Sequence, residues 1–352
     1  MAVGKVVFVG TGAIGASVAA WLAPHHPETY CVDRGETLEA LRSVGIRHYD
    51  GSKGPDSAEV VRVRVMEDLS LLGVDDIVVF GVKNYSLDAV AKATSEACHG
   101  RPLAVSMANG LDNQAILPRH FSRTAYCVVG YNAWLDAPAV VGWQNRGPLV
   151  LGAAEGPPTE TLKEFSTVLS RACEVEITDR LLDAARSKLI VNLVNTITTL
   201  VGYGFREERD IASLQRLMTR ALYEGILAVR AAGGREYHVG NMPSWAAISA
   251  GALLPRAFTK RMFRKSLSAM VKSSMSQDVL ARGRAETELD SLTGYIVQLA
   301  KETGTPVPYN EALYRIAKES FSRPGFRPYS AASLLEAVRS GGMPRVADDP
   351  PR

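Results

Sequence analysis

The chain has 352 residues, which is long enough for two domains and a large hydrophobic core. Hydrophobic residues make up 46% and charged residues 22%, as in an ordinary globular protein. The 40 basic and 37 acidic residues give a net charge of only +3, so the overall charge does not indicate binding to nucleic acid. No apolar run reaches the about 18 residues of a membrane span, and we expect no leader before the first strand. We therefore expect neither a nucleic-acid nor a membrane partner.

The four cysteines are scattered and form no CxxC pair. This spacing fits neither a zinc site nor a disulfide framework. We expect reduced thiols, no bound metal and a cytoplasmic location. The cysteines are Cys31, Cys98, Cys127 and Cys173.

Short β-forming runs alternate with helical stretches in the first half of the chain, which favours a doubly wound, parallel α/β sheet. We expect a Rossmann-type dinucleotide-binding domain over 1–175, an all-helical domain over 176–335 and a disordered tail over 336–352. The strands are expected at Lys5–Val9, Tyr30–Val32, Ile77–Gly81, Leu103–Met107, Tyr126–Val129 and Leu149–Leu151. The main helices of the second half are expected at Glu160–Cys173, Arg180–Leu200, Ile211–Ala232 and Met275–Thr303.

The first strand ends in a glycine-rich turn with the pattern GxGxxG, and a helix is expected directly after it. Gly10 allows the tight turn, Gly12 lets the backbone approach a pyrophosphate, and Gly15 lets the helix pack closely on the strand. The helix N-terminus offers N–H groups and a positive dipole end to phosphates. The predicted cofactor loop is Gly10, Thr11, Gly12, Ala13, Ile14 and Gly15.

Further polar residues follow the ends of other predicted strands. Arg34 follows the second strand, Lys83 a later one, and Asn109-Gly110 the next. In an open α/β sheet, ligands bind at the carboxyl ends of the strands. We therefore expect these residues to share one edge of the sheet with the glycine loop.

The residues after the second strand bear on the choice of cofactor. Asp33 could accept a ribose 2′-hydroxyl, as the acidic residue of NAD enzymes does. Arg34 could instead pair with a 2′-phosphate, and Lys83 could add a second positive charge. An aspartate beside a phosphate repels it unless its carboxylate points away. We favour NADPH, with NAD as the alternative.

A polar stripe follows one face of an otherwise apolar helix in the second half. Lys188, Asn192 and Asn195 are spaced i, i+4 and i+7. A buried lysine is costly unless it has a partner or a function, and burial lowers the pKa of an ammonium, which suits a proton donor. The alternative is a structural stripe whose asparagines bind backbone groups.

Together these motifs resemble the ketopantoate reductase family (2-dehydropantoate 2-reductase). The matching pieces run in family order over roughly residues 4–320. They are the glycine loop with Arg34, Val82-Lys83, Asn109-Gly110, Lys188–Asn192, Ser273–Asp278, Thr287–Asp290 and Val307–Asn310.

The resemblance implies a Rossmann domain joined to a helical domain, an active site in the cleft between them, and NADPH-dependent reduction of a small 2-oxo acid, in pantothenate biosynthesis. Lys188 would donate the proton to the carbonyl oxygen and stabilise the developing alkoxide. Asn109 would hold the nicotinamide end and the substrate. Asn192 and Ser274 would bind substrate polar groups, and Glu288 would accept a hydrogen bond from the substrate hydroxyl.

The chain departs from the family pattern at two positions of the expected site. The second asparagine expected eight residues after Lys188 is replaced by Thr196, and Asn195 stands one position earlier. The substrate carboxylate could be Glu286 or Glu288. We favour Glu288, because fourteen residues after Ser274 is close to four turns of a helix of ~3.6 residues per turn.

Extra chain around residues 239–269 is a third departure from the family pattern. Within it, the segment 256–265 carries five basic residues interleaved with Phe258, Met262 and Phe263. It is either a flap or anion-binding patch, or an amphipathic helix with a solvated basic face.

Two other functions stay open: an NAD-dependent opine- or hydroxyacid-type dehydrogenase that uses Asp33, and a non-catalytic nucleotide-binding sensor. The polar stripe argues against a sensor, because cofactor binding alone does not need it. A homodimer is compatible with the sequence, which does not determine the oligomeric state.

Overall fold

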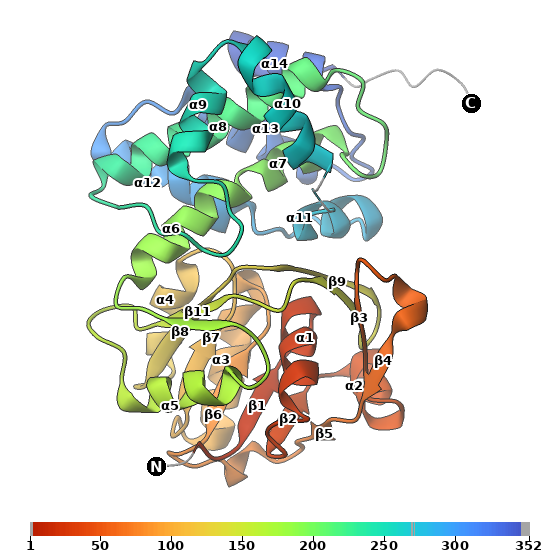
Figure 1. Ribbon diagram of the computed structural model, residues 1–352, viewed down its shortest axis with the longest axis vertical. Coiled ribbons are helices and arrows are strands. Elements are labelled where there is room, and N and C mark those ends of the chain that lie inside the picture. The colour runs from red at the N-terminus through yellow and green to blue at the C-terminus, as the bar shows by residue number, and fades with distance from the viewer. Residues whose placement is uncertain (1–2, 269, 271, 346–352) are drawn as a thin grey trace. The chain divides into compact units, whose positions relative to one another are not determined.

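The computed structural model describes residues 3–268, 270 and 272–345, and these form two compact units (Figure 1). The first unit runs to Ala185 and also takes in Val239–Asn241, and the remaining described residues form the second. No helix in the described part of the chain is long and apolar enough to cross a bilayer.

The core of the first unit is an eight-stranded sheet. Its strand order is β12 (Val175–Ile177), β11 (Leu149–Gly152), β8 (Thr124–Val129), β7 (Leu103–Ser106), β6 (Ile77–Phe80), β1 (Val6–Val9), β2 (Thr29–Val32) and β5 (Arg64–Val65). Neighbouring strands are parallel except for β11 and β8. The expected Rossmann-type α/β fold with a helical second part is therefore confirmed, with one antiparallel step.

A second sheet of four strands is a feature that the sequence did not predict. Its order is β4 (Glu59–Val61), β3 (Ile46–Asp50), β10 (Val140–Gln144) and β9 (Asn132–Ala137). Helix α1 (Ala13–Leu22) contacts β1 and β2 of the large sheet and β3, β9 and β10 of the small one. The ring of Trp21 on α1 packs edge-on against Trp143 on β10, with 5.4 Å between centroids. The glycine-loop helix is therefore held from both sides.

The remaining helices of the first unit follow its strands. They are α2 (Gly35–Ser43), α3 (Asn84–Cys98), α4 (Asp112–Ile116) and α5 (Glu160–Leu169). The thiols of all four cysteines are buried.

The second unit is built around the long helix α8 (Ile211–Ala231). Contacts to it come from α7 (Val194–Val201), α9 (Trp245–Leu253), α12 (Tyr295–Thr303), α13 (Pro308–Phe321) and α14 (Ala331–Ser340), which Figure 1 shows gathered about it. The second unit also holds α10 (Arg256–Ser268) and the short α11 (Ser274–Ser276), and the boundary between the units falls within α6 (Leu181–Asn192).

Two helices expected to be continuous are broken, so those predictions were wrong. The expected helix over 180–200 divides at Leu193, where the backbone tightens and Leu193 N bonds to Ile190 O at 3.1 Å. Of the expected helix over 275–303, the last part is present as α12 (Tyr295–Thr303), but the part before it consists of two π-helical turns, η4 (Gln277–Ala281) and η5 (Asp290–Gly294), with an irregular loop between them. Gly283 lies in that loop at φ +62°, a conformation that ends a helix.

The expected tail from residue 336 begins too early. Helix α14 continues to Ser340, because Ala337 and Val338 complete its buried apolar face. Beyond the helix, Arg345 N still donates to Ser333 Oγ at 2.8 Å. Residues 346–352 of the predicted tail lie outside the described residues.

Three residues of the extra segment, Val239–Asn241, belong to the first unit. The side chain of Val239 is fully buried, and a Cβ added to Gly130 would lie 2.8 Å from its Cγ1. Gly240 packs against Pro148 in the same way. The chain therefore crosses between the units three times.

The motif Val307–Asn310, which helped to identify the family resemblance, has a structural role. The buried carboxylate of Glu224 accepts hydrogen bonds from Tyr309 N at 3.0 Å and from Asn310 N and Nδ2, both at 2.9 Å. Burial raises the pKa of Glu224, although these hydrogen bonds oppose the shift. Glu224 thus caps the N-terminus of α13 from α8.

We expect Glu224→Ala to lower the free energy of unfolding by about 2–3 kcal/mol, because buried donors at the start of α13 lose their charged acceptor. Urea denaturation followed by circular dichroism measures the change. The control is Glu311→Ala, an exposed carboxylate in the first turn of the same helix. Equal losses in both variants would contradict the capping role.

Candidate functional site

The glycine loop of the first unit has the shape that a pyrophosphate needs. Gly10 has φ +86°, and a Cβ at Gly15 would overlap the carbonyl oxygen of Gly10. A Cβ at Gly12 would meet only Gly81 O, at an ordinary 3.5 Å. Packing within the protein therefore requires glycine at 10 and 15, whereas Gly12 leaves open space for a ligand. No side chain caps the N-terminus of α1, so its first N–H groups are available to phosphate oxygens.

The carboxylate of Asp33 is engaged by the glycine loop. Its Oδ2 accepts from Thr11 N and from Thr11 Oγ1, each at 2.6 Å, and its Oδ1 accepts from Arg34 N at 2.8 Å. Thr11 is buried and Arg34 is exposed. Asp33 therefore fixes the glycine loop through Thr11, and the neighbouring Arg34 is exposed to solvent.

The loops after β6 and β7 place the next two predicted residues. Lys83 is the N-cap residue of α3 and is half-buried. The buried side chain of Asn84 donates from Nδ2 to Asn109 O, and the buried Asn113 donates to Ala108 O at 3.0 Å. Two buried amides thus fix the loop that presents the half-buried Asn109.

The predicted residues of the first unit follow four adjacent parallel strands. In the sheet order β7-β6-β1-β2, these strands end before Asn109, Lys83, the glycine loop and Arg34. The structure therefore brings this set to one sheet edge, as the strand ends predicted.

Lys188 and Asn192 lie one turn apart on α6 in the second unit. Both side chains are half-buried, whereas Leu189 and Ile190 between them are buried. Lys188 is therefore less buried than the apolar character of the segment predicted.

The helix break at Leu193 separates Asn195 from the other two polar residues, because Asn195 belongs to α7. Its backbone carbonyl accepts from Thr198 Oγ1 and Thr199 Oγ1 at 3.0 and 2.7 Å. Thr196, which replaces the family asparagine, is buried and bonds through its hydroxyl to Thr293 on η5 at 2.7 Å.

Ser274 and Glu288 lie next to each other although the chain between them is not a helix. Ser274 Oγ is 3.5 Å from Glu288 Oε2, and Glu288 is buried while Glu286 is exposed. The reason given for choosing Glu288, helix phase, was wrong, since the irregular loop rather than four turns brings the two side chains together. Ser273 caps α11 by accepting from Ser276 N at 3.1 Å.

Two acidic residues beside this pair have structural partners that the sequence analysis did not foresee. Asp278 is fully buried and pairs with Arg282 at 2.9 Å. Asp290 accepts from Lys318 at 2.7 Å and from Tyr314 at 2.6 Å. Burial opposes ionisation of Asp290, but these hydrogen bonds outweigh it and lower the pKa of that carboxyl. The partners of Asp290 could not be found from spacing, because Lys318 and Tyr314 come from the distant helix α13, whereas Asp278 and Arg282 stand at an i, i+4 spacing.

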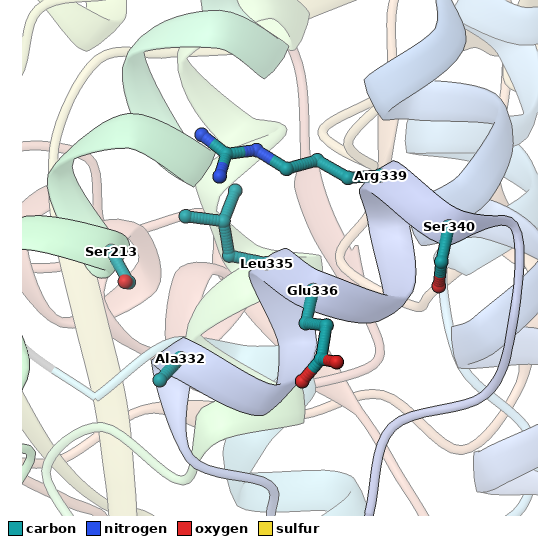
Figure 2. A pocket seen from close by; sticks show the side chains of 6 residues that line it. All are labelled: Ser213, Ala332, Leu335, Glu336, Arg339 and Ser340. Atoms are coloured by element: carbon teal, nitrogen blue, oxygen red, sulfur yellow. The ribbon is translucent and has the colours of Figure 1, made fainter.

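A separate hollow of about 400 Å³ lies between the first turn of α8 and α14 (Figure 2). None of its lining residues belongs to the predicted site. They are Ser213, Ala332, Leu335, Glu336, Arg339 and Ser340.

The sheet order, the glycine loop and the helical second unit define a Rossmann-type dinucleotide-binding protein with an α-helical partner unit. Two family models match the chain: "Ketopantoate reductase PanE/ApbA" over residues 6–156 and "Ketopantoate reductase PanE/ApbA C terminal" over residues 180–320. The chain belongs to this family.

Curated relatives align with this chain over nearly their whole length. The 2-dehydropantoate 2-reductase of Halobacterium salinarum is 27% identical over 310 residues, which cover 86% of this chain and 94% of the relative. The 2-dehydropantoate 2-reductase of Pyrococcus horikoshii is 24% identical over 324 residues, which cover 91% of this chain and 99% of the relative.

Solved structures show the same fold. A PanE/ApbA family ketopantoate reductase from Ralstonia eutropha superposes with a TM-score of 0.70 at 26% identity, over 91% of this chain and all of that chain. A D-mandelate dehydrogenase solved with NADH and anilino(oxo)acetate gives a TM-score of 0.71 at 16% identity, with the same coverage.

Proposed function

We propose that the protein reduces a 2-oxo acid to the 2-hydroxy acid with NADPH, and that 2-dehydropantoate is the simplest substrate. Membership of the ketopantoate reductase family supports a nicotinamide-dependent oxidoreductase acting on a 2-oxo acid. The observation that supports it most is the pair Lys188 and Asn192, polar side chains that stand at either end of the apolar run 189–191 on α6, inside the segment that the C-terminal family model matches.

The orientation of Asp33 supports NADPH over NADH. An NAD enzyme uses such a carboxylate to accept ribose hydroxyls. Here three donors from Thr11 and Arg34 bind the two oxygens of Asp33, so fewer of its acceptor positions are left for a ribose hydroxyl. The exposed Arg34 can then bind a 2′-phosphate through its planar fork, with Lys83 as a second cation.

The proposed cofactor fits the residues present, since the space above Gly12 and the N-terminus of α1 suit its pyrophosphate. Bound NADPH would supply the hydride to the carbonyl carbon. Lys188 would bind the carbonyl oxygen by a charged hydrogen bond and donate one proton to it. The oxygen then becomes the hydroxyl of the product, and the lysine becomes a neutral amine. The amine then recovers its proton from solvent.

The other predicted residues are assigned to binding. Asn109 would orient the nicotinamide end and the substrate, and Asn192 would bind the substrate's polar groups. Ser274 and Glu288 would act together on its hydroxyl, which their 3.5 Å separation supports. Asn195 is a weaker candidate, because it lies on α7 beyond the helix break.

A homodimer and a cytoplasmic location are further parts of this proposal. The buried thiols of all four cysteines support a reducing compartment. The proposed reaction depends on neither the homodimer nor the cytoplasmic location.

The test is a panel of 2-oxo acids assayed with NADPH and with NADH by loss of absorbance of the reduced nicotinamide. We expect turnover of 2-dehydropantoate with NADPH at a kcat/KM at least about tenfold above that with NADH. No turnover of any 2-oxo acid would overturn the reductase, and a preference for NADH would overturn the cofactor assignment.

The choice between the two glutamates has its own test. We expect Glu288→Gln to raise KM for the 2-oxo acid by roughly tenfold to a hundredfold, the value of one charged hydrogen bond. Glu286→Gln is the matched control, and its KM should stay within about twofold of wild type because that side chain is exposed. The reverse pattern would assign the role to Glu286.

A further inference from the structure

Helix α10, in the segment that is extra relative to the family pattern, is anchored to its unit by one face only. Gln215 Nε2 on α8 donates to the buried Thr259 Oγ1 at 2.9 Å, and Tyr203 OH donates to Leu267 O at 2.8 Å. At about 100° per residue, Thr259, Phe263 and Leu267 share one side of the helix. Thr259 and Leu267 are buried and Phe263 half-buried, so this side is the packed one.

A second side of the helix is apolar and lies in solvent. Phe258 is 77% exposed and Met262 is 48% exposed, and their spacing of four places them in one strip. Leu253 and Leu254, at the junction of α9 and α10, are also more than half exposed. These four residues, the α10 apolar strip, gather large side chains that a monomeric protein normally buries.

Positive charge borders the α10 apolar strip. Segment 256–265 holds five basic residues and no acidic one, although the whole chain has a net charge of only +3. By helix phase, Arg261 and Lys265 flank Phe258 and Met262. Within the described part of the chain, no ion pair neutralises Lys260, Arg261, Arg264 or Lys265, and all four are exposed.

We propose that α10 docks the protein peripherally on an anionic lipid surface. Phenylalanine, leucine and methionine beside lysine and arginine, on a helix with no acidic residue, are the composition of an interfacial amphipathic helix. Long basic side chains reach lipid headgroups while their stems cover apolar surface. A protein partner is less favoured, because protein interfaces are depleted in lysine. A nucleic-acid partner is less favoured, because a phosphate backbone binds basic side chains and not exposed leucine and methionine. The proposal concerns contact with one leaflet and needs no spanning helix.

The test is flotation of the full-length protein with vesicles of phosphatidylcholine alone and vesicles in which about a third of the lipid is phosphatidylglycerol. We expect at least about tenfold more protein on the anionic vesicles, and less at high salt because the charges are then screened. Equal recovery on both vesicle types would overturn the proposal.

Matched variants separate the two contributions. Phe258→Ser with Met262→Ser, and Arg261→Gln with Lys265→Gln, should each reduce vesicle binding about tenfold while the thermal midpoint stays unchanged. The controls remove similar exposed groups from the first unit: Val60→Ser with Leu71→Ser, and Arg47→Gln with Lys53→Gln. Binding that survives both α10 variants overturns the proposal. A dimer seen by light scattering that only the α10 variants dissociate also overturns the proposal, because a second copy of the chain would then cover the strip. Binding of an RNA oligonucleotide as tight as binding of the vesicles overturns it as well.

Discussion

Replacing Lys188 by alanine is expected to lower kcat with 2-dehydropantoate, or with any other accepted 2-oxo acid, by about 10²–10⁴-fold. The variant loses both the proton donor and the positive charge beside the developing alkoxide. The dissociation constant of NADPH, measured by fluorescence titration, should stay within about twofold of wild type. The proposed contacts of the cofactor come from the glycine loop, Arg34 and Lys83 rather than from α6.

Two further variants separate proton transfer from charge. Lys188→Arg keeps the charge, but a guanidinium does not give up a proton near neutral pH, so its kcat should remain low. Added methylamine should partly restore kcat in Lys188→Ala by replacing the missing ammonium. Lys301→Ala, an exposed lysine on α12, is the control and should behave as wild type. Near-normal turnover in Lys188→Ala would remove this residue from the mechanism.

Replacing Arg34 by alanine is expected to weaken NADPH binding by roughly tenfold to a hundredfold and to leave NADH binding nearly unchanged. The range corresponds to one charged hydrogen-bonding group of about 1.5–3 kcal/mol on the 2′-phosphate. Titration of the nicotinamide fluorescence of both cofactors measures the ratio directly.

The selectivity ratio, rather than either constant alone, tests the assignment of Arg34. Arg42→Ala removes another exposed arginine, on α2, whose partner is Glu67, and it should leave the ratio unchanged. An equal loss for NADPH and NADH in Arg34→Ala would show that the residue supports the loop and does not contact a phosphate.

The parts of the fold that the sequence predicted are those with strong local signals. The runs before Gly10, Lys83 and Asn109 are short, apolar and followed by turn residues, and each became a buried strand. The small sheet escaped prediction because its strands are partly polar, as in the run Ile46–Asp50, and pair with residues far along the chain.

The candidate site shows the same division between local and distant information. Residues that follow strand ends reach one sheet edge, because the parallel register fixes where those ends lie. The proximity of Ser274 and Glu288 depends instead on a loop between two π-helical turns, which has no periodic signal. Likewise, the engagement of Asp33 by Thr11 is a contact across 22 positions that composition does not reveal.

The three crossings of the chain limit how this protein can be dissected or recombined. A fragment that ends at Ala185 lacks Val239, whose buried side chain fills the space beside Gly130. A chimaera that takes its helical unit from a relative would lose Val239–Asn241, and the replacing segment would have to fit beside Gly130 and Pro148. A single cut point after Ala185 is therefore not a modular boundary in this chain.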